Sequence, residues 1–310
     1  MISKIWTSNI KNGIYGGLFP VIDPFEKNWL YVGDGWGSSF ASMKLRKFSL
    51  CTGEEIQSVS IKNNVRCLTF NANQIDLFAV TNNKIFQVSR NTLEVYKKFE
   101  KGIQQYNDYV VSDEQDSLLM MNHRGEFLFI YNYKNEKGFK KKIGPCSGIF
   151  KKNNQEYYIF SGYKGKVVLY NLKENSVADL LSTDVFHSVK FYNNDIAVLR
   201  LGFIEYGEGK SWRITPMNKI RVVDIRDLKN SMDLDIGFDF QSFTVDNGII
   251  YLWNQNNFWT YSVDSKEVIS KLSISEDEYI MQVFSDQGKI LTESNTDDRG
   301  RTFNCYEFKL

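Results

Sequence analysis

Cysteine is scarce and scattered in this sequence. The four cysteines, Cys51, Cys67, Cys146 and Cys305, are too few for a disulfide framework in a chain of 310 residues and too far apart for a CxxC metal site. We therefore expect four free thiols, no bound metal and no cofactor. Unpaired cysteines favour the cytoplasm, and residues 1–12 have no apolar core of signal-peptide length. A secreted chain whose signal had been removed would look similar.

An excess of one charge and long apolar runs are also missing. The 38 basic and 37 acidic side chains leave a net charge of +1, which excludes a chain-wide basic surface for nucleic acid, although not a local patch. No window approaches ~18 consecutive apolar residues, so no membrane-spanning helix is expected. The hydrophobic share of 42% and the charged share of 24% predict a folded chain with a sizeable core.

The common catalytic motifs are absent too. The sequence contains no Walker loop, no GxGxxG after a strand, no HExxH and no GxSxG. Of its two histidines, His123 is expected to be a solvated turn residue. His187 is a candidate acid or base beside Cys146 or Glu205. A Cys–His nucleophilic pair would need its two side chains within hydrogen-bond reach.

What the sequence does have is an internal repeat. β-Branched and aromatic residues alternate with polar ones around a turn rich in Gly, Asn or Asp in residues 43–59, 83–99, 165–181, 218–234 and 257–272, with a weaker copy in 125–142. Each copy predicts a two-strand hairpin. Two more short strands precede each copy, so the repeating unit has four strands.

The spacing of these units indicates the fold. They recur about every 40 residues, a period typical of β-propellers, and are predicted to start near residues 12, 64, 105, 144, 185, 238 and 278. We expect an all-β, seven-bladed propeller that occupies residues 1–310 as a single domain. Two separate β-sandwiches are the alternative, but sandwiches do not predict equal intervals.

The hairpin copies resemble the third and fourth strands of WD40 and YVTN-type propeller repeats, and residues 165–181 match best. The resemblance covers nearly the whole chain at the level of the fold. The Gly-His and Trp-Asp pairs of that family are missing, and in place of Trp-Asp the chain has Tyr170-Asn171, Val223-Asp224 and Ser262-Val263. The resemblance therefore implies the propeller fold without implying the family's buried Asp–His network.

The two ends of the chain predict how the ring closes. The seventh unit, residues 279–310, offers only three strands. Residues 2–8 can supply its missing outer strand by pairing with residues 302–308. Joining the ends in this way would cover sheet edges that otherwise invite aggregation.

The residues that begin the first strands form a first set of candidates for binding. In a propeller the first strand of each blade lines the central channel, and its first residues open at one face. These residues are Arg66, Asn107, Cys146, His187 and Gln241, with Tyr15 as the candidate from the first unit. We expect a polar mouth that orients a ligand by hydrogen bonds. The alternative is a water-filled channel whose polar lining only satisfies backbone groups.

Insertions form a second set. The link between the second and third strands is short in four units and long in the first, fifth and seventh, at residues 33–43, 202–217 and 294–301, all on the same face as the strand starts. The candidate binding residues in these links are Trp36, Tyr206, Trp212, Arg213, Arg299 and Arg301, beside the acidic residues Glu205, Glu208, Asp297 and Asp298. Exposed Trp, Tyr and Arg commonly anchor interfaces. The alternative is that these links fold down as a stabilising cap.

Three functions remain open at this point. The leading hypothesis is a monomeric, non-enzymatic protein that presents its loop-bearing face to a protein or peptide partner, with no nucleic acid partner. The second is a lyase or hydrolase with its site at the channel mouth. The third is a protective, immunity-type partner that blocks another protein, and it would use the same face.

Overall fold

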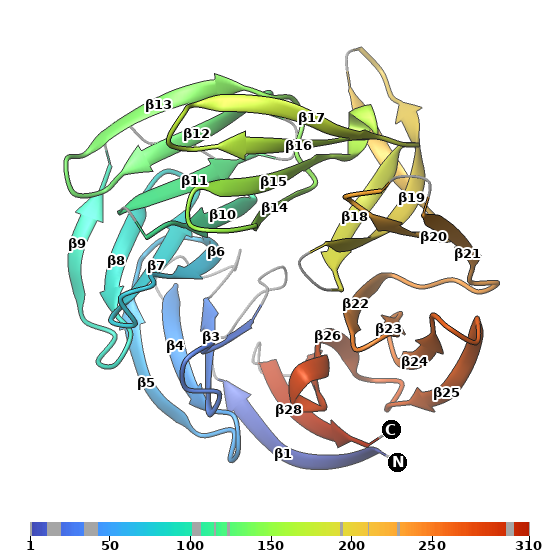
Figure 1. The fold of residues 1–310 in the computed structure, drawn as a ribbon. Coiled ribbons are helices and arrows are strands. Elements are labelled where there is room, and N and C mark those ends of the chain that lie inside the picture. The colour runs from blue at the N-terminus through green and yellow to red at the C-terminus, as the bar shows by residue number, and fades with distance from the viewer. Residues whose placement is uncertain are drawn as a thin grey trace.

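The structure, a computed structural model, describes residues 2–10, 20–33, 43–100, 107–114, 116–122, 125–192, 195–209, 211–227, 230–295 and 301–309. Within these ranges, 28 strands form seven antiparallel four-stranded sheets. The sheets stand side by side in a ring, as the blades of a propeller (Figure 1). The predicted all-β, seven-bladed fold is confirmed. No helix in the described ranges is long and apolar enough to cross a membrane.

The blades are numbered in chain order, and their strands are as follows. Blade 1 contains β2 (Val21–Ile22), β3 (Trp29–Gly33), β4 (Lys44–Ser49) and β5 (Glu55–Ser60). Blade 2 contains β6 (Val65–Phe70), β7 (Asp76–Thr81), β8 (Ile85–Ser89) and β9 (Val95–Phe99). Blade 3 contains β10 (Tyr109–Ser112), β11 (Ser117–Met121), β12 (Phe127–Asn132) and β13 (Lys137–Lys142). Blade 4 contains β14 (Gly148–Lys151), β15 (Glu156–Ser161), β16 (Lys166–Asn171) and β17 (Ser176–Ser182).

The last three blades complete the ring. Blade 5 contains β18 (Phe186–Phe191), β19 (Ile196–Tyr206), β20 (Trp212–Asp224) and β21 (Ser231–Asp235). Blade 6 contains β22 (Ser242–Asp246), β23 (Ile249–Trp253), β24 (Asn257–Ser262) and β25 (Glu267–Ser273). Blade 7 contains β26 (Tyr279–Phe284), β27 (Lys289–Asn295), β28 (Arg301–Phe308) and β1 (Ile2–Ile10). Two short 3-10 helices, η2 (Gly162–Lys164) and η3 (Ser285–Gln287), lie between strands.

The blades are held together by apolar side chains on both faces of each sheet. In β7, Leu77 and Ala79 lie in the core shared with blade 1, whereas Phe78 and Val80 lie in the core shared with blade 3. One such core lies at each of the seven interfaces between neighbouring blades. Burial on both faces explains why the second strands read as nearly continuous apolar runs and not as a clean alternation.

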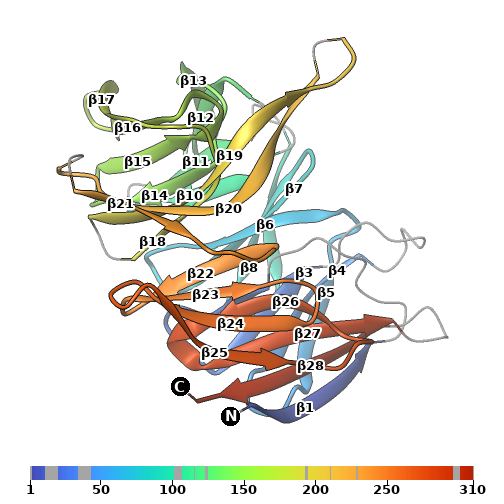
Figure 2. The ribbon, with the colours of Figure 1, turned by 90° about the vertical axis from the view of Figure 1, so that its right-hand side faces the viewer.

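The insertion of blade 5 does not form the loop that its length suggested. β19 and β20 continue past the rest of the sheet as a two-stranded ribbon, paired from Gly202↔Pro216 to Tyr206↔Trp212. This ribbon, which we call the arm (residues 202–216), projects away from the ring (Figure 2). Its β-branched and aromatic residues suit extended backbone, which accounts for strand in place of loop. The long links of blades 1 and 7, at residues 34–42 and 296–300, lie outside the described residues.

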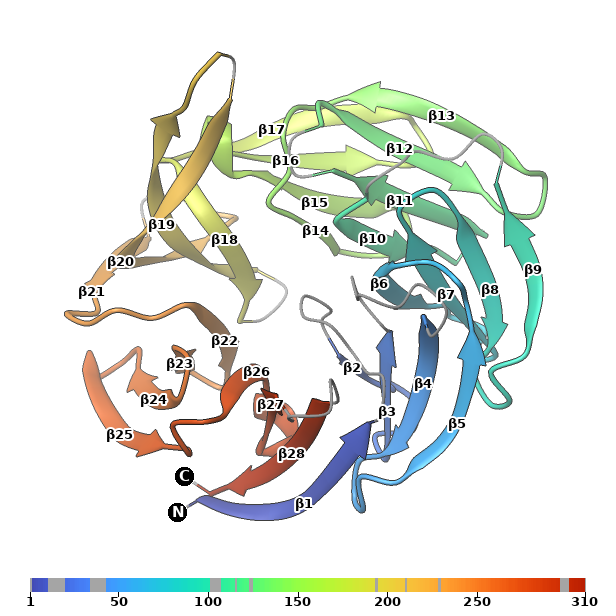
Figure 3. The same cartoon turned by 180° about the vertical axis from the view of Figure 1, so that it is seen from behind.

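The ring closes through its termini, as predicted. β1 pairs antiparallel with β28, from Ile2↔Phe308 to Ile10↔Arg301, and the two ends lie side by side (Figure 3). Trp6 of β1 is 7% exposed and packs into the core between blades 7 and 1. Its Nε1 donates a hydrogen bond to the carbonyl of Leu50 in blade 1, at 2.8 Å. A glycine is needed at position 53, where φ is +72° and a Cβ would lie 2.4 Å from the Trp6 ring.

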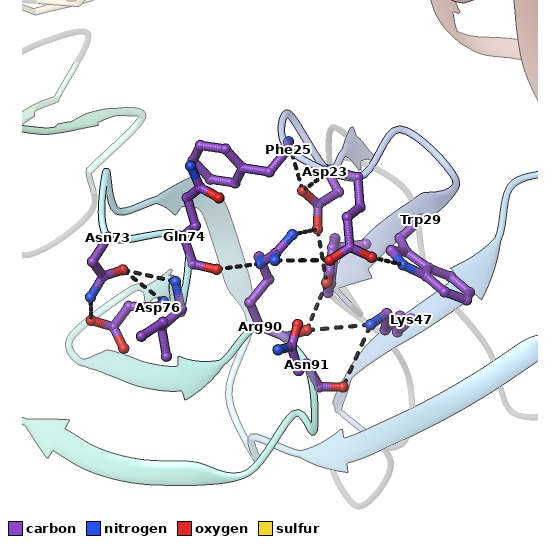
Figure 4. A network of polar contacts seen from close by, with 12 residues as sticks. Asp23, Phe25, Trp29, Lys47, Asn73, Gln74, Asp76, Arg90 and Asn91 are labelled. Atoms are coloured by element: carbon purple, nitrogen blue, oxygen red, sulfur yellow. Dashed lines mark hydrogen bonds and ion pairs between the residues drawn. The ribbon is translucent and has the colours of Figure 1, made fainter.

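A polar network adds to the apolar contact between blades 1 and 2 (Figure 4). The fully buried Asp23 of blade 1 accepts a hydrogen bond from Nη1 of Arg90 in blade 2, at 2.7 Å. Nη2 of the same guanidinium pairs with Glu26 at 3.1 Å. The hydroxyl of Tyr31 donates to the Arg90 carbonyl at 2.7 Å. Lys47 is buried beside the network, and this burial lowers the pKa of its ammonium. These paired charges link two neighbouring sheets.

Candidate functional site

Strand pairing places two of the predicted features on the same face of the ring. The first strand of each blade begins opposite the end of the second strand, as Val65↔Thr81 in blade 2 and Phe186↔Leu201 in blade 5 show. The first residues of the first strands and the links between second and third strands therefore lie on the same face of the ring. We call it the mouth face. The arm stands on this face, at blade 5.

One side of the arm is supported by blade 4. The ring of Tyr163, from η2, packs on the ring of Trp212 with their centroids 4.3 Å apart. The Tyr163 hydroxyl hydrogen-bonds to Tyr206, and this bond is the main reason why the pKa of Tyr163 is raised. Tyr206 and Trp212 are cross-strand partners, so Tyr163 contacts both strands of the arm through this pair. Tyr206 nevertheless remains 74% exposed.

The other side of the arm carries charge and an exposed ring. Glu205 and Arg213 face each other across the ribbon, and Nε of Arg213 donates to Oε2 of Glu205 at 2.6 Å. Hydrogen bonds from Arg213 and then Thr215 lower the pKa of the Glu205 carboxyl. Phe203 is 48% exposed on this side. The predicted candidates Glu205, Tyr206, Trp212 and Arg213 thus come together on one ribbon.

Arg200 ties the base of the arm to blade 6. Its three guanidinium nitrogens donate to the carbonyls of Met217 (2.9 Å), Gln241 (2.8 Å) and Phe240 (2.6 Å). The guanidinium carbon also lies 3.9 Å from the centre of the Phe240 ring. Burial lowers the pKa of this arginine to about 10. In the described part of the chain no carboxylate forms an ion pair with Arg200, although the negative charge of Asp239 favours the protonated guanidinium.

Three of the predicted mouth residues have accessible side chains. Arg66 pairs with Asp108, and its Nε donates to the Asn107 carbonyl at 3.3 Å. His187 and Gln241 are exposed. Although His187 meets solvent at the mouth, protein surrounds much of its ring. This burial and then the charge of Arg200 lower the pKa of the imidazole, which is therefore neutral at pH 7.

Two other predicted mouth residues are buried, which corrects the expectation of an open polar ring at their positions. Asn107 and Cys146 are each 1% exposed. Cys146 lies in the core between blades 3 and 4, and its Sγ donates to the Gly148 carbonyl at 3.2 Å. Burial raises the pKa of this thiol. No hydrogen bond joins Cys146 to His187 among the described residues, so the nucleophilic pair considered from the sequence is not formed.

Several candidates cannot be placed. Trp36, Tyr15, His123, Asp297, Asp298 and Arg299 lie outside the described residues. Arg301 begins β28, but only its backbone is described. Across the described ranges there is no group of three His, Cys, Asp or Glu side chains able to hold a metal ion.

A groove of about 350 Å³ lies at the outer part of the interface between blades 4 and 5, lined by Leu181, Ser182, Thr183, Asp184, Arg221, Val223 and Ser231. Its one arginine is fully engaged within the protein. Nε and Nη2 of Arg221 bind the two carboxylate oxygens of Asp233 at 2.6 and 2.9 Å, and Nη1 donates to Thr183 at 2.7 Å. The guanidinium of Arg221 therefore stabilises the walls of the groove through bonds within the protein.

Sequence reasoning missed two residues that shape the site. Arg200 was detectable, because a charge interrupts the apolar second strand of blade 5, residues 196–201. Tyr163 gave no such signal, since it stands in a short link that looks like those of other blades. Its contact with Trp212 depends on how blades 4 and 5 pack together.

No protein-family model and no curated protein sequence matches the chain. Solved structures do match it. The structure of U3-55K superposes with a TM-score of 0.66 at 7% sequence identity, covering 98% of each chain. The Neurospora crassa Pan2 WD40 domain superposes with a TM-score of 0.69 at 8% identity, covering 100% of this chain and 96% of that one. The fold is a WD40-like β-propeller. At such low identity the likeness of this propeller to the two structures is one of fold alone.

Proposed function

We propose that this propeller is a non-enzymatic protein that binds a protein or peptide partner on its mouth face, with the arm as the principal contact. The observation that carries the proposal is the arm itself. It holds Tyr206 and Phe203 in solvent, 74% and 48% exposed, on a ribbon fixed by Tyr163 and Arg200. Exposed apolar area on a rigid projection costs solubility unless a partner covers it.

The rest of the mouth face fits a binding role. Arg66, His187 and Gln241 offer polar groups around the channel end, which would orient a partner while the aromatic residues supply most of the affinity. Trp36, Arg299 and Arg301 remain candidate contacts from the links of blades 1 and 7, which are neighbours in the closed ring. We place the protein in the cytoplasm, which its four free cysteines favour, and we expect it to be a monomer.

The test is to recover the partner from the native host with the full chain as bait and then to measure its affinity for single variants. Trp212→Ala and Tyr206→Ala are each expected to weaken binding by ~2 kcal/mol without changing the fold, because truncating an aromatic anchor removes a large contact. We expect the same of Trp36→Ala. Lys173→Ala, in an ordinary repeat turn, is the control. Loss of binding on mutating the opposite face, with the arm variants unaffected, would contradict the proposal.

A further inference from the structure

In the part of the chain that the structure describes, both edges of the two-stranded arm are free of a third strand. β18 stops pairing with β19 at Phe186↔Leu201, and β21 stops pairing with β20 at Lys219↔Asp235. Beyond these points, among the described residues, Gly202–Tyr206 and Trp212–Pro216 pair only with each other. A sheet edge of this kind presents main-chain donors and acceptors in a regular row, ready to pair with another strand.

Two bonds show which main-chain groups point outward. The Gly207 N–H donates across the ribbon to the Ser211 carbonyl at 3.1 Å, so this pair faces inward. Inward and outward pairs alternate in an antiparallel ladder, which makes Tyr206↔Trp212 and Ile204↔Ile214 outward pairs. Gly202 fits this alternation, because its N–H donates outward to the Val185 carbonyl at 3.0 Å. The pairing of β18 with β19 stops before Ile204 and Tyr206. The outward N–H and C=O groups of these two residues are therefore the next ones along β19 that an added strand would pair with.

The edge of β19 suits an added strand better than the edge of β20. On β20 the row of outward main-chain groups includes that of Pro216, which is the partner of Gly202. Proline has no N–H to donate to an added strand. On β19 the row continues directly from the last bond made beside β18. It is flanked by Phe203 on one side of the ribbon and by Tyr206 on the other, the two most exposed apolar side chains of the arm. These rings can cover alternate side chains of an incoming strand.

We propose that the arm binds an extended segment of a partner protein as an extra strand along the free edge of β19, in line with β18. The segment carries aromatic or aliphatic residues at alternate positions, where Phe203 and Tyr206 can cover them. This inference rests on the proposed function, since it names the kind of partner that the mouth face takes and the manner in which it binds.

The test uses the full chain and peptides selected on it from a random twelve-residue phage-displayed library. The deciding variants are Ile204→Pro and Ile214→Pro. Both residues are partners in the same pair, and each substitution removes one outward N–H without breaking an internal bond. Ile204→Pro is expected to weaken binding of the selected peptides at least tenfold and Ile214→Pro less than twofold, with unchanged thermal midpoints.

Hydrogen exchange on the unmutated protein keeps the test decisive if a proline variant fails to fold. Peptide binding is expected to slow exchange of the Ile204 and Tyr206 amides at least tenfold and to leave those of Trp212 and Ile214 unchanged. Protection of the β20 amides instead, equal effects of the two proline variants, or the absence of any binding peptide would overturn the proposal. A dimer of the protein that Ile204→Pro converts to monomer would also overturn it, because the occupant would then be a second copy.

The outcome separates this inference from the proposed function. If Trp212→Ala abolishes binding of the recovered partner while Ile204→Pro does not, the mouth face remains the binding surface and only the strand pairing fails. If neither change matters, both proposals fail.

Discussion

The residue that follows the third strand has the same backbone role in six blades but not the same side chain. Its N–H donates to a carbonyl in the turn between the first and second strands, for example Leu172 to Gln155 at 2.8 Å and Arg90 to Ile75 at 2.7 Å. Most blades have an apolar residue there. Arg90 in blade 2 and Tyr133 in blade 3 instead reach a polar group of the preceding blade, Asp23 and Asn71 respectively. A single position thus sets whether two blades are joined by apolar contact alone or also by hydrogen bonds.

Glu278 is a second residue whose bonds reach across a whole blade. Its buried carboxylate accepts hydrogen bonds from Lys4 of β1 at 2.8 Å, from Tyr306 of β28 at 2.9 Å and from Thr292 of β27. Burial alone would raise the pKa of this carboxyl, but the three hydrogen bonds together outweigh it, and the pKa lies below its ordinary value of 4.5. The ionised form is therefore the one that the fold stabilises.

We expect Glu278→Gln to lower the free energy of unfolding by about 1–2 kcal/mol at pH 7, because it weakens charge-assisted bonds to a buried group. A carboxyl with a lowered pKa in the fold contributes stability above its unfolded pKa and loses it as the pH falls through the folded one. The difference between the variant and the natural chain should thus shrink below pH 4.5. Urea unfolding at pH 7, 5 and 3 measures it. A difference that grew in acid would contradict this account.

The cysteines should differ sharply in reactivity although all four are free. Burial raises the pKa of Cys67 and of Cys305 to about 12 and raises that of Cys146 as well. Cys51 is exposed in the turn after β4. Since the thiolate is the reactive form, we expect one thiol to react with a maleimide in the native protein at pH 7.5. All four should react in denaturant, and mass spectrometry of the labelled peptides would identify them.

At the scale of the element, the repeats were easier to predict than the insertions. The hairpin copies at residues 43–59 and 165–181 became β4–β5 and β16–β17 because alternation and turn residues act within a few residues of each other. The arm was located but given the wrong form. Its residues have strand propensity, yet whether they pair depends on support from outside blade 5, such as the ring of Tyr163. Local pattern does not contain that contact.

The arm should be dispensable for folding. Its paired residues lie outside the seven interface cores, so replacing residues 202–216 with a four-residue turn like that at 254–257 is expected to change the thermal midpoint by less than ~3 °C. Removing a core side chain of the same blade should cost far more, and Val198→Ala is a suitable comparison because Val198 is 1% exposed. Differential scanning calorimetry distinguishes the two. A large loss on shortening the arm would mean that it caps the ring, the alternative that its sequence left open.

At the scale of the whole molecule, the number of blades followed from the period, and the closure followed from a missing strand. Both depend on the number and spacing of the strands, which the alternating pattern of the sequence predicts. The contents of the channel mouth did not follow in the same way. Asn107 and Cys146 begin their units like His187 but are buried, Cys146 in the core between blades 3 and 4, because the side-chain direction at a strand start depends on the packing of the neighbouring sheet. The single-domain division of residues 1–310 stays a prediction.

Closure should determine the stability of the entire ring. Deleting residues 1–8 removes most of β1, the Trp6 side chain from the core of blades 7 and 1, the Trp6–Leu50 hydrogen bond and the Lys4–Glu278 ion pair. It also exposes the edge of β28. Truncating one buried tryptophan alone typically costs 3–5 kcal/mol, so we expect a loss of at least ~4 kcal/mol, a large share of ordinary protein stability.

Two variants separate closure from mere shortening of the chain. Trp6→Ala keeps the strand but opens the core, and it should account for most of the loss. Ser3→Ala, at an exposed position of the same strand, should change the free energy of unfolding by less than ~0.5 kcal/mol. Because every blade packs on two neighbours, the opened ring should unfold in one transition at a lower denaturant concentration, with increased aggregation through the bare edge of β28. A truncated chain as stable as the full one would show that the ends do not hold the ring together.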